Sequence, residues 1–236
     1  VTYFCFSCFV LCIFLFAIPK VKIEKLVINM KNNTKQIIVE AALQLFHTNG
    51  YDGTSIRDIA LKAEINPANI AYYFKNKNGL LEYCFTNYLE KYIEIFEIEI
   101  RKLEPLRADV CLFAILSSLL DFQAKHFIAA RFIIRELTLD TRLNREILST
   151  YMAKERYYFQ YLIETGIKNS VFRQVNIPTF IVQIKGLLTG LVIHAHYAAE
   201  LLHMQPRDKY YIEQYKNQCL SFVSQNLLTS RAVVSL

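Results

Sequence analysis

The segment from Thr54 to Gly79, TSIRDIALKAEINPANIAYYFKNKNG, constrains the fold of this chain more than any other. Its first apolar residues, Ile56, Ile59, Ala60 and Ala63, follow the i, i+3, i+4, i+7 spacing of a helix that packs on a core. A second run of helix-forming residues follows after only a few positions. We therefore predict two short helices joined by a tight turn.

Both helices have start signals. Thr54 precedes the first helix as an expected N-cap, because its hydroxyl can accept a hydrogen bond from an unpaired backbone N–H. Asn66 is the expected cap of the second helix, and Pro67 occupies the first helical position, where a missing N–H is no loss. Helix, short turn and helix form the helix-turn-helix layout, in which the second helix enters the major groove of DNA.

The second helix has one apolar and one polar face. On a helical wheel Ile70 and Phe74 point inward together with Pro67. The outward residues are Ala68, Asn69 and Tyr72, with Tyr73 at the flank. Asn binds adenine edges, Ala contacts thymine methyl groups and Tyr hydroxyls reach phosphates. With Lys75 and Lys77 close behind, this acid-free face predicts a DNA-binding surface.

The block from Thr34 to about Glu90 resembles the DNA-binding domain of TetR-type regulators, in AALQLFHTNGYDGTSIRDIALKAEI followed by ANIAYYFKNKNGLL. The resemblance implies that a homodimer binds double-stranded DNA at a palindromic operator. The family positions that touch DNA map onto Thr54, Asn66, Pro67, Ala68, Asn69, Tyr72, Tyr73 and Lys77. Residues Ala68, Asn69 and Ala71 depart from the family's usual choices, so its base preference does not carry over.

These positions divide into two expected roles. Thr54, Tyr73 and Lys77 anchor the phosphates, whereas the run from Asn66 to Asn69, together with Tyr72, contacts base edges in the groove.

The composition indicates an all-α protein, because 53% of the residues are hydrophobic, Gly and Pro are few, and no stretch alternates with period two. We expect a three-helix head with the helix-turn-helix, joined to a larger helical dimerisation and effector body. The expected parts are an apolar leader at 1–29, the DNA-binding domain at 30–80, a connecting helix at 81–104 and the body at 105–236. The expected helices are 34–48, 76–102, 107–126, 127–138, 142–169, 178–203 and 207–229. The formal charge of +6 permits nucleic-acid binding without requiring it.

The leader has two interpretations. Residues 3–18 are uncharged and almost wholly apolar, which is marginal for a transmembrane anchor that needs about 20 residues. The alternative, which we favour, is a misplaced start, since Met30 precedes a polar arm and then the first helix of the head. A secretory signal is excluded by the missing basic region before the apolar run.

The helix at 178–203 and the one after it form the expected dimer seam. The apolar residues Phe180, Ile181, Ile184, Leu187, Leu188, Leu191, Val192 and Ala195 cover much of the first helix. Gly186 and Gly190 would allow a second backbone to come close, although core packing explains the same pattern. The aromatic run from Tyr151 to Tyr161 either lines an apolar ligand pocket or belongs to the ordinary core.

A narrower resemblance rests on RELTLDTRLNREILSTYMAKERYYF (Arg135 to Phe159) together with ANIAYYFKNKNGLLE. Both stretches are similar to the RefZ group, TetR-type proteins of spore-forming bacteria tied to placement of the division septum during sporulation. That resemblance implies a protein partner for the body in place of a small-molecule ligand.

The chain shows no constellation for catalysis, metal binding or a cofactor. His194 and His196 are two positions apart on a helix and so do not face one ion together. Cys84, Cys111 and Cys219 are far apart in apolar helices, as expected of buried free thiols. We therefore expect no enzyme, no metal and no cofactor.

The sequence supports two hypotheses for a cytoplasmic, nucleoid-associated protein. The first is a transcriptional repressor controlled by a ligand that shifts the dimer between head spacings. The second is a DNA-bound regulator of cell division, in the manner of the RefZ group, whose output is a protein contact.

Overall fold

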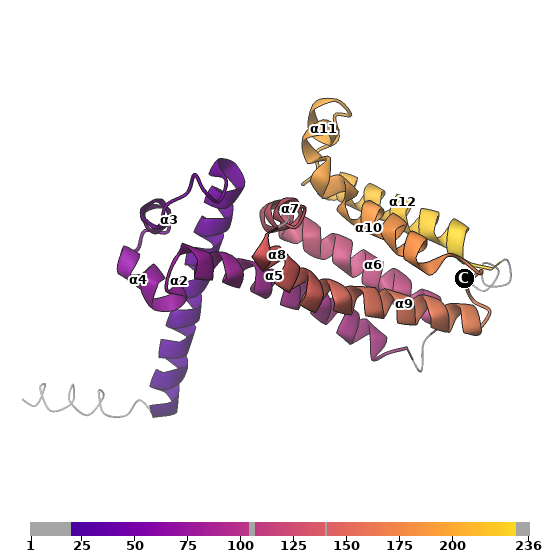
Figure 1. Ribbon diagram of the computed structural model, residues 1–236, viewed down its shortest axis with the longest axis horizontal. Coiled ribbons are helices and arrows are strands. Elements are labelled where there is room, and N and C mark those ends of the chain that lie inside the picture. Colours follow the sequence, from indigo (N-terminus) through magenta and orange to yellow (C-terminus); the bar gives the residue numbers. More distant parts are fainter. Residues whose placement is uncertain (1–19, 104–106, 140, 230–236) are drawn as a thin grey trace, which may run out of the picture.

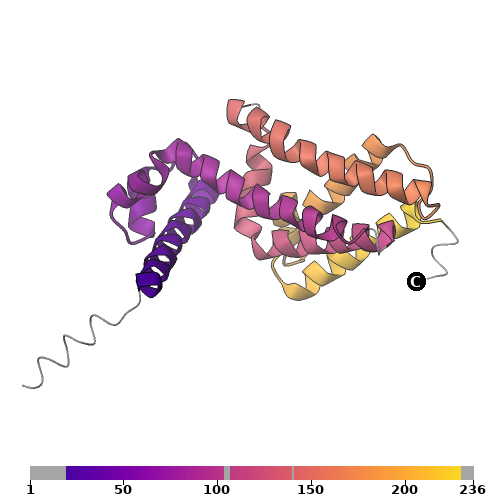
Figure 2. The same cartoon turned by 90° about the horizontal axis from the view of Figure 1, so that it is seen from below.

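The computed structural model describes residues 20–103, 107–139 and 141–229, and the regular elements in those ranges are helices (Figure 1). Three helices form the head: α2 (Lys20–Asn49), α3 (Ile56–Lys62) and α4 (Pro67–Phe74). Helix α5 (Lys77–Ile100) runs from the head along the body, which Figure 2 shows most clearly. The only extended pairing in the described ranges is an isolated bridge between Phe172 and Leu228. The predicted all-α class and two-part architecture are confirmed.

The body consists of the remaining helices. They are α6 (Ala108–Lys125), α7 (Phe127–Glu136), α8 (Arg142–Ile147), the π-turn η1 (Leu148–Met152), α9 (Ala153–Lys168), α10 (Ile177–Ile193), α11 (Ala195–Glu200) and α12 (Lys209–Leu227). Helix α6 packs against α5, α9 and α12, and α10 packs against α9 and α7. Helix α11 projects from the end of α10, away from the rest of the body (Figure 1).

The first helix corrects one prediction. We expected a polar arm and a helix from Thr34, but α2 already begins at Lys20, because its sequence between those residues has neither Gly nor Pro to interrupt it. Its end agrees with the prediction: Asn49 is the last helical residue, and Gly50 follows with a positive φ of 77°. Residues 3–18, to which the anchor and misplaced-start interpretations apply, lie outside the described residues.

Two long body helices are interrupted where continuous ones were predicted. The stretch 142–169 is divided by the π-turn η1, and the stretch 178–203 bends at His194, which has φ −92° and ψ 19°. In the part of the chain that the structure describes, no single helix is long and apolar enough to cross a membrane. One pair, α6 with α7, passes that test by length and composition alone, across a bend of 101°.

Two hydrophobic clusters form the interior, and α5 contributes to both. Its first half, from Leu80 to Leu89, belongs to the head cluster, whereas Tyr92, Ile93 and Phe96 belong to the body cluster. The three cysteines predicted to be buried free thiols, Cys84, Cys111 and Cys219, are buried and unpaired.

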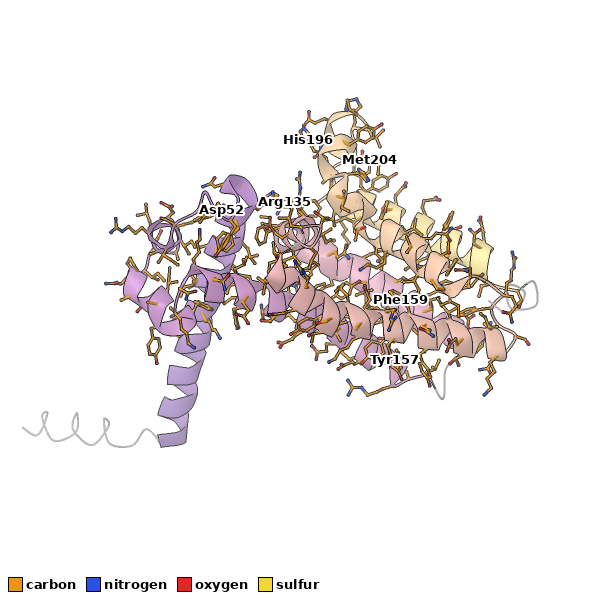
Figure 3. The ribbon with its side chains drawn as sticks, in the orientation of Figure 1. Asp52, Arg135, Tyr157, Phe159, His196 and Met204 are labelled. Atoms are coloured by element: carbon orange, nitrogen blue, oxygen red, sulfur yellow. The ribbon has the colours of Figure 1, made fainter. Side chains whose placement is uncertain are left out.

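The head cluster extends into the body through α7. Phe132 is fully buried and its ring centroid lies 5.5 Å from that of Phe46 in α2 and 6.1 Å from that of Phe85 in α5. Arg135, one turn further along α7, donates a 3.3 Å hydrogen bond to the carbonyl oxygen of Phe46 near the end of α2 (Figure 3). A cation near a helix C-terminus is favourable there. The head and the body thus share one apolar joint.

A buried polar cluster links three helices inside the body. Glu155 of α9 is 4% exposed and receives bonds of 2.8 and 2.9 Å from Lys185 Nζ of α10 and one of 2.6 Å from the hydroxyl of Tyr92 of α5. Burial first, and then the Glu155 carboxylate, raise the pKa of Tyr92, so the phenol keeps its proton.

The aromatic run of α9 divides between core and surface. Phe159 is fully buried, whereas Tyr157 and Tyr161 are 61% and 42% exposed and stack with ring centroids 6.2 Å apart (Figure 3). The two exposed tyrosines therefore line no interior pocket.

Candidate nucleic-acid interface

Helix α3 starts one residue later than predicted. Its N-cap is Ser55, whose hydroxyl accepts from Asp58 N at 3.1 Å while the Asp58 carboxylate accepts from Ser55 N at 2.8 Å. This reciprocal pair is a capping box. Hydrogen bonding to the carboxylate from the Ser55 side chain, and then from the Ser55 backbone N–H, favours the ionised acid and lowers the pKa of Asp58. Thr54 was wrongly predicted to be the cap, because Ser55 is the residue with an acid three positions on.

Thr54 instead holds the turn that leads into α3. It is 1% exposed, and its hydroxyl donates a 2.8 Å hydrogen bond to the carbonyl oxygen of Gly50. A phosphate oxygen accepts hydrogen bonds, and the single O–H donor of Thr54 already donates to Gly50 inside the protein. The structure therefore does not offer the Thr54 side chain for the phosphate contact that we predicted.

Helix α4 begins as predicted. Asn66 Oδ1 accepts from Ala68 N at 2.8 Å, and Pro67 occupies the first turn. Glu64 provides the sharp change of direction between α3 and α4 with a φ of 55°. The two helices are thus fixed at a tight turn of a few residues, which is the helix-turn-helix geometry.

The outward face of α4 is open to solvent. Ile70 and Phe74 are buried in the head cluster, as predicted. The exposed residues are Asn66, Pro67, Ala68, Asn69, Ala71 and Tyr72. Pro67 was predicted to point inward, but Ala63 and Ile65 already pack beneath this turn and leave the proline at the surface. The exposed set contains amide, methyl and phenol groups and no acid.

Tyr72 and Tyr73 form the edge of this face. Tyr72 is 70% exposed, and Tyr73 is half-buried at the flank, with the two rings edge to face at 5.0 Å. The ring of Tyr73 lies 6.2 Å from that of Phe74, and Lys35 of α2 places its ammonium group 5.6 Å from the ring centroid of Phe74 and 3.8 Å from that of Tyr83. Sequence patterns did not reveal this support, because it joins α2, α4 and α5.

Lys77 is tied into the head. Its ammonium group donates to the carbonyl oxygens of Tyr51 and Thr54, each at 3.0 Å, and lies 4.2 Å from the centroid of the Tyr51 ring. The start of α5 is thereby fastened to the turn before α3. Two of the three N–H donors are used, which leaves one for a phosphate oxygen.

The predicted site residues therefore separate into two groups. Seven of them lie on α4, at its N-cap or at the start of α5 and keep exposed or half-exposed side chains: Asn66, Pro67, Ala68, Asn69, Tyr72, Tyr73 and Lys77. Thr54 lies behind them in the turn. Among the described residues no three His, Cys, Asp or Glu side chains are grouped to hold a metal ion.

Comparisons with known proteins agree with this geometry. Residues 38–84 match the model of the bacterial regulatory proteins of the tetR family. YttP of Bacillus subtilis, described as a probable HTH-type transcriptional regulator, is 39% identical over 186 residues, which cover 79% of this chain and 90% of YttP. IcaR of Staphylococcus aureus, a negative transcriptional regulator of a biofilm operon, is 37% identical over 62 residues, covering 25% of this chain and 33% of IcaR.

The fold itself recurs in solved structures. The ketosteroid transcriptional regulator KstR2 of Mycobacterium tuberculosis superposes with a TM-score of 0.68 at 15% identity, over 83% of this chain and 95% of KstR2. The match of the head to the family model and the similarity to YttP place the chain among DNA-binding regulators, which are not enzymes. The chain belongs to the tetR family of bacterial transcriptional regulators.

The hydrogen bonds of Lys77 should contribute measurably to the stability of the head. Lys77→Met keeps the apolar stem and removes both hydrogen bonds to the turn, so we expect the free energy of unfolding to fall by about 1–3 kcal/mol. Urea unfolding followed by circular dichroism, at one fixed protein concentration, measures the change. Lys62→Met, at an exposed position of α3, is the control and should stay within about 0.5 kcal/mol of the parent. Equal stability of the two variants would show that these bonds do not hold the head together.

Proposed function

We propose that this protein is a transcriptional repressor that binds a palindromic operator in double-stranded DNA as a homodimer. The observation that carries the proposal is the exposed, acid-free face of α4, held at a tight turn by the Asn66 cap. Asn66, Pro67, Ala68, Asn69 and Tyr72 enter the major groove and contact base edges. Tyr73 and the remaining donor of Lys77 bind the phosphate backbone, which fixes the helix in the groove.

The choice of repression is supported by IcaR, whose description is that of an HTH-type negative transcriptional regulator. A dimer that covers an operator blocks access to it without any chemistry, and no catalytic group is needed. The protein would act in the cytoplasm, on the chromosome.

The homodimer is supported by an apolar surface on α10, α11 and α12. The residues that we predicted for the seam include Phe180, Ile184, Leu188 and Val192, but these are buried within the protomer. The opposite face is the open one. Its large apolar side chains are at least 45% exposed, and they are Val182, Ile193, Tyr197, Leu201, Leu202, Tyr210 and Phe222. Large exposed apolar side chains gathered on helices that contact one another are typical of an interface.

Gly186 lies on the same open face, since a Cβ built there meets no atom within 4 Å. Gly190 does not, because its Cβ would meet the hydroxyl of Tyr215 of α12 at 2.5 Å. Only the first glycine of the GxxxG pair can therefore admit a second copy of the chain.

A second candidate function is a DNA-bound regulator of septum placement during sporulation, as the similarity to the RefZ group implies. The stacked, exposed pair Tyr157 and Tyr161 on α9 favours it, because exposed aromatic side chains are typical anchors of protein interfaces. This pair lies on a different helix from the proposed dimer face, so a dimer keeps it available.

Mapping of the bound chromosomal sites separates the two functions. For a repressor we expect few palindromic sites upstream of genes, with transcripts of those genes rising when the protein is deleted. Sites that cluster by chromosome position, with transcripts unchanged, would instead support the division regulator. The absence of any recurring sequence among the bound sites would contradict both.

Sequence readout by α4 is tested with Asn69→Ala. We expect binding to the cognate site to weaken by about 1–3 kcal/mol with relaxed preference at one base pair, because an amide reads a base edge directly. Binding to random DNA should stay unchanged. Tyr73→Ala should weaken binding to all sequences, and Asn169→Ala, at an exposed position after α9, should change nothing. Equal losses on cognate and random DNA for Asn69→Ala would refute the readout role.

The dimer face is tested with Val182→Glu and Gly186→Leu. Both positions face open space, so the protomer should keep its helical content while the dimer weakens by about 2 kcal/mol or more, roughly thirtyfold. Sedimentation over a concentration series measures this. Ile98→Glu, at an exposed apolar position of α5, is the control and should leave the dimer intact. A dimer of unchanged strength in both variants would assign the interface to another surface.

A further inference from the structure

A cavity of about 270 Å³ lies where the head meets the body. Residues of α2 form one wall, the middle of α5 forms another, and the corner between α6 and α7 closes the third. Arg207, from the segment between α11 and α12, reaches its rim. We call this space the junction cavity. It is separate from the face of α4 and from the open faces of α10 and α12.

The charged groups around the junction cavity are mostly cationic. Lys91 of α5, Lys125 of α6 and Arg207 line it, and only one acid, Glu40 of α2, does so. Glu40 is hydrogen-bonded to Gln36 at 2.8 Å, whereas none of the three cations has an ion-pair or hydrogen-bond partner among the described residues. Three cations without a partner among the described residues, all lining one recess, create a positive potential there, which attracts an anion.

Polar and apolar groups meet inside the cavity. The rings of Phe122 and Phe127 and the side chain of Leu43 form apolar walls. Tyr88 also lines it; this residue is 6% exposed, and its hydroxyl is buried without a partner in the described part of the chain. Buried hydroxyls usually have a partner, supplied by protein, water or ligand. A ligand that is partly apolar and partly polar suits such a lining.

His126 lies at the corner between α6 and α7, with its ring 4.8 Å from that of Phe122. Burial, and then the charges of Lys91 and Lys125, lower its pKa. The imidazole therefore adds no charge of its own to the cavity. Because Lys91 and Lys125 both lower the pKa of this one ring, both charges lie close to it.

We propose that the junction cavity binds a small organic acid, with the carboxylate near Lys91, Lys125 and Arg207 and the hydrocarbon part against Phe122, Phe127 and Leu43. The volume of about 270 Å³ lies just below the range of about 300–1,000 Å³ that is typical of sites for drug-sized ligands, so it suits a smaller molecule such as a short organic acid. Bound there, the acid touches α2 of the head and the α6–α7 corner of the body together. It therefore favours one orientation of the head, and hence one spacing of the two heads in a dimer.

The regulatory half of this inference rests on the proposed function, but the binding half does not. Calorimetric titration of the full chain with butyrate, octanoate and benzoate tests binding without DNA. We expect at least one of these acids to bind, while octanamide, benzamide and inorganic phosphate bind at least tenfold more weakly, because the amides lack the charge and phosphate lacks the apolar part.

The double variant Lys91→Ala and Lys125→Ala locates the site. Both lysines are exposed, so the fold should survive, and affinity for the acid should fall about tenfold or more with two charge-assisted contacts removed. The matched control is Lys154→Ala with Lys168→Ala, which removes the same charge from exposed positions of α9. The absence of binding by every acid, or equal affinities in the two double variants, would overturn the site.

Operator binding with and without the acid tests the regulatory half. We expect the acid to change the affinity of the parent for DNA at least fivefold and to leave that of the Lys91 and Lys125 double variant unchanged. An acid that binds the parent but leaves DNA affinity unaltered would overturn the regulatory role. A chain that binds the acid but no specific DNA would refute the proposed function and leave the binding site standing.

Discussion

Helix α5 belongs to two hydrophobic cores, and the arrangement of head and body depends on this sharing. The buried stripe passes without a break from Leu89 in the head cluster to Tyr92 in the body cluster. A packed core admits few alternative arrangements, so a helix embedded in both cores transmits a displacement as a rigid rod. Phe132 of α7 adds a second connection, because it packs on Phe46 of the head and on Phe85 of α5. The head can move only by changing these contacts.

Local signals in the sequence were sufficient to predict several of the helix boundaries in the head. The cap of α4 at Asn66 and the stop of α2 at Gly50 each depend on one side chain or one backbone angle, so the residue type reveals them. The predicted N-cap of α3 was wrong by one residue, because two hydroxyl residues, Thr54 and Ser55, are adjacent there. Only the acid of Asp58 selects Ser55 over Thr54 as the cap. The capping-box pattern was present in the sequence and would have decided the matter.

Contacts between residues far apart in the sequence could not be predicted from the spacing of apolar residues. Lys77 is separated by 23 residues or more from the carbonyl groups that it binds, and nothing in the spacing of the sequence marks that contact. The π-turn at Leu148–Met152, which interrupts the helix predicted at 142–169, contains no Gly or Pro that would have indicated a break. A π-turn inserts an extra residue into a helical turn and rotates the helix on its C-terminal side. Here it directly precedes α9, whose Glu155 is buried against side chains of two other helices.

The buried Glu155 connects the helix of the proposed dimer face with the helix that enters the head. A carboxylate taken out of water is stable only while its partners stay in place, and removing one of them costs about 3–5 kcal/mol. Glu155 has both partners on other helices: Lys185 on α10 and Tyr92 on α5. A rearrangement of α10 therefore moves α5 with it or leaves a buried charge unpaired, and the second outcome is strongly disfavoured. Because α5 continues into the head cluster, the polar cluster couples the helix that carries Val182 and Gly186 to the helix that positions Lys77.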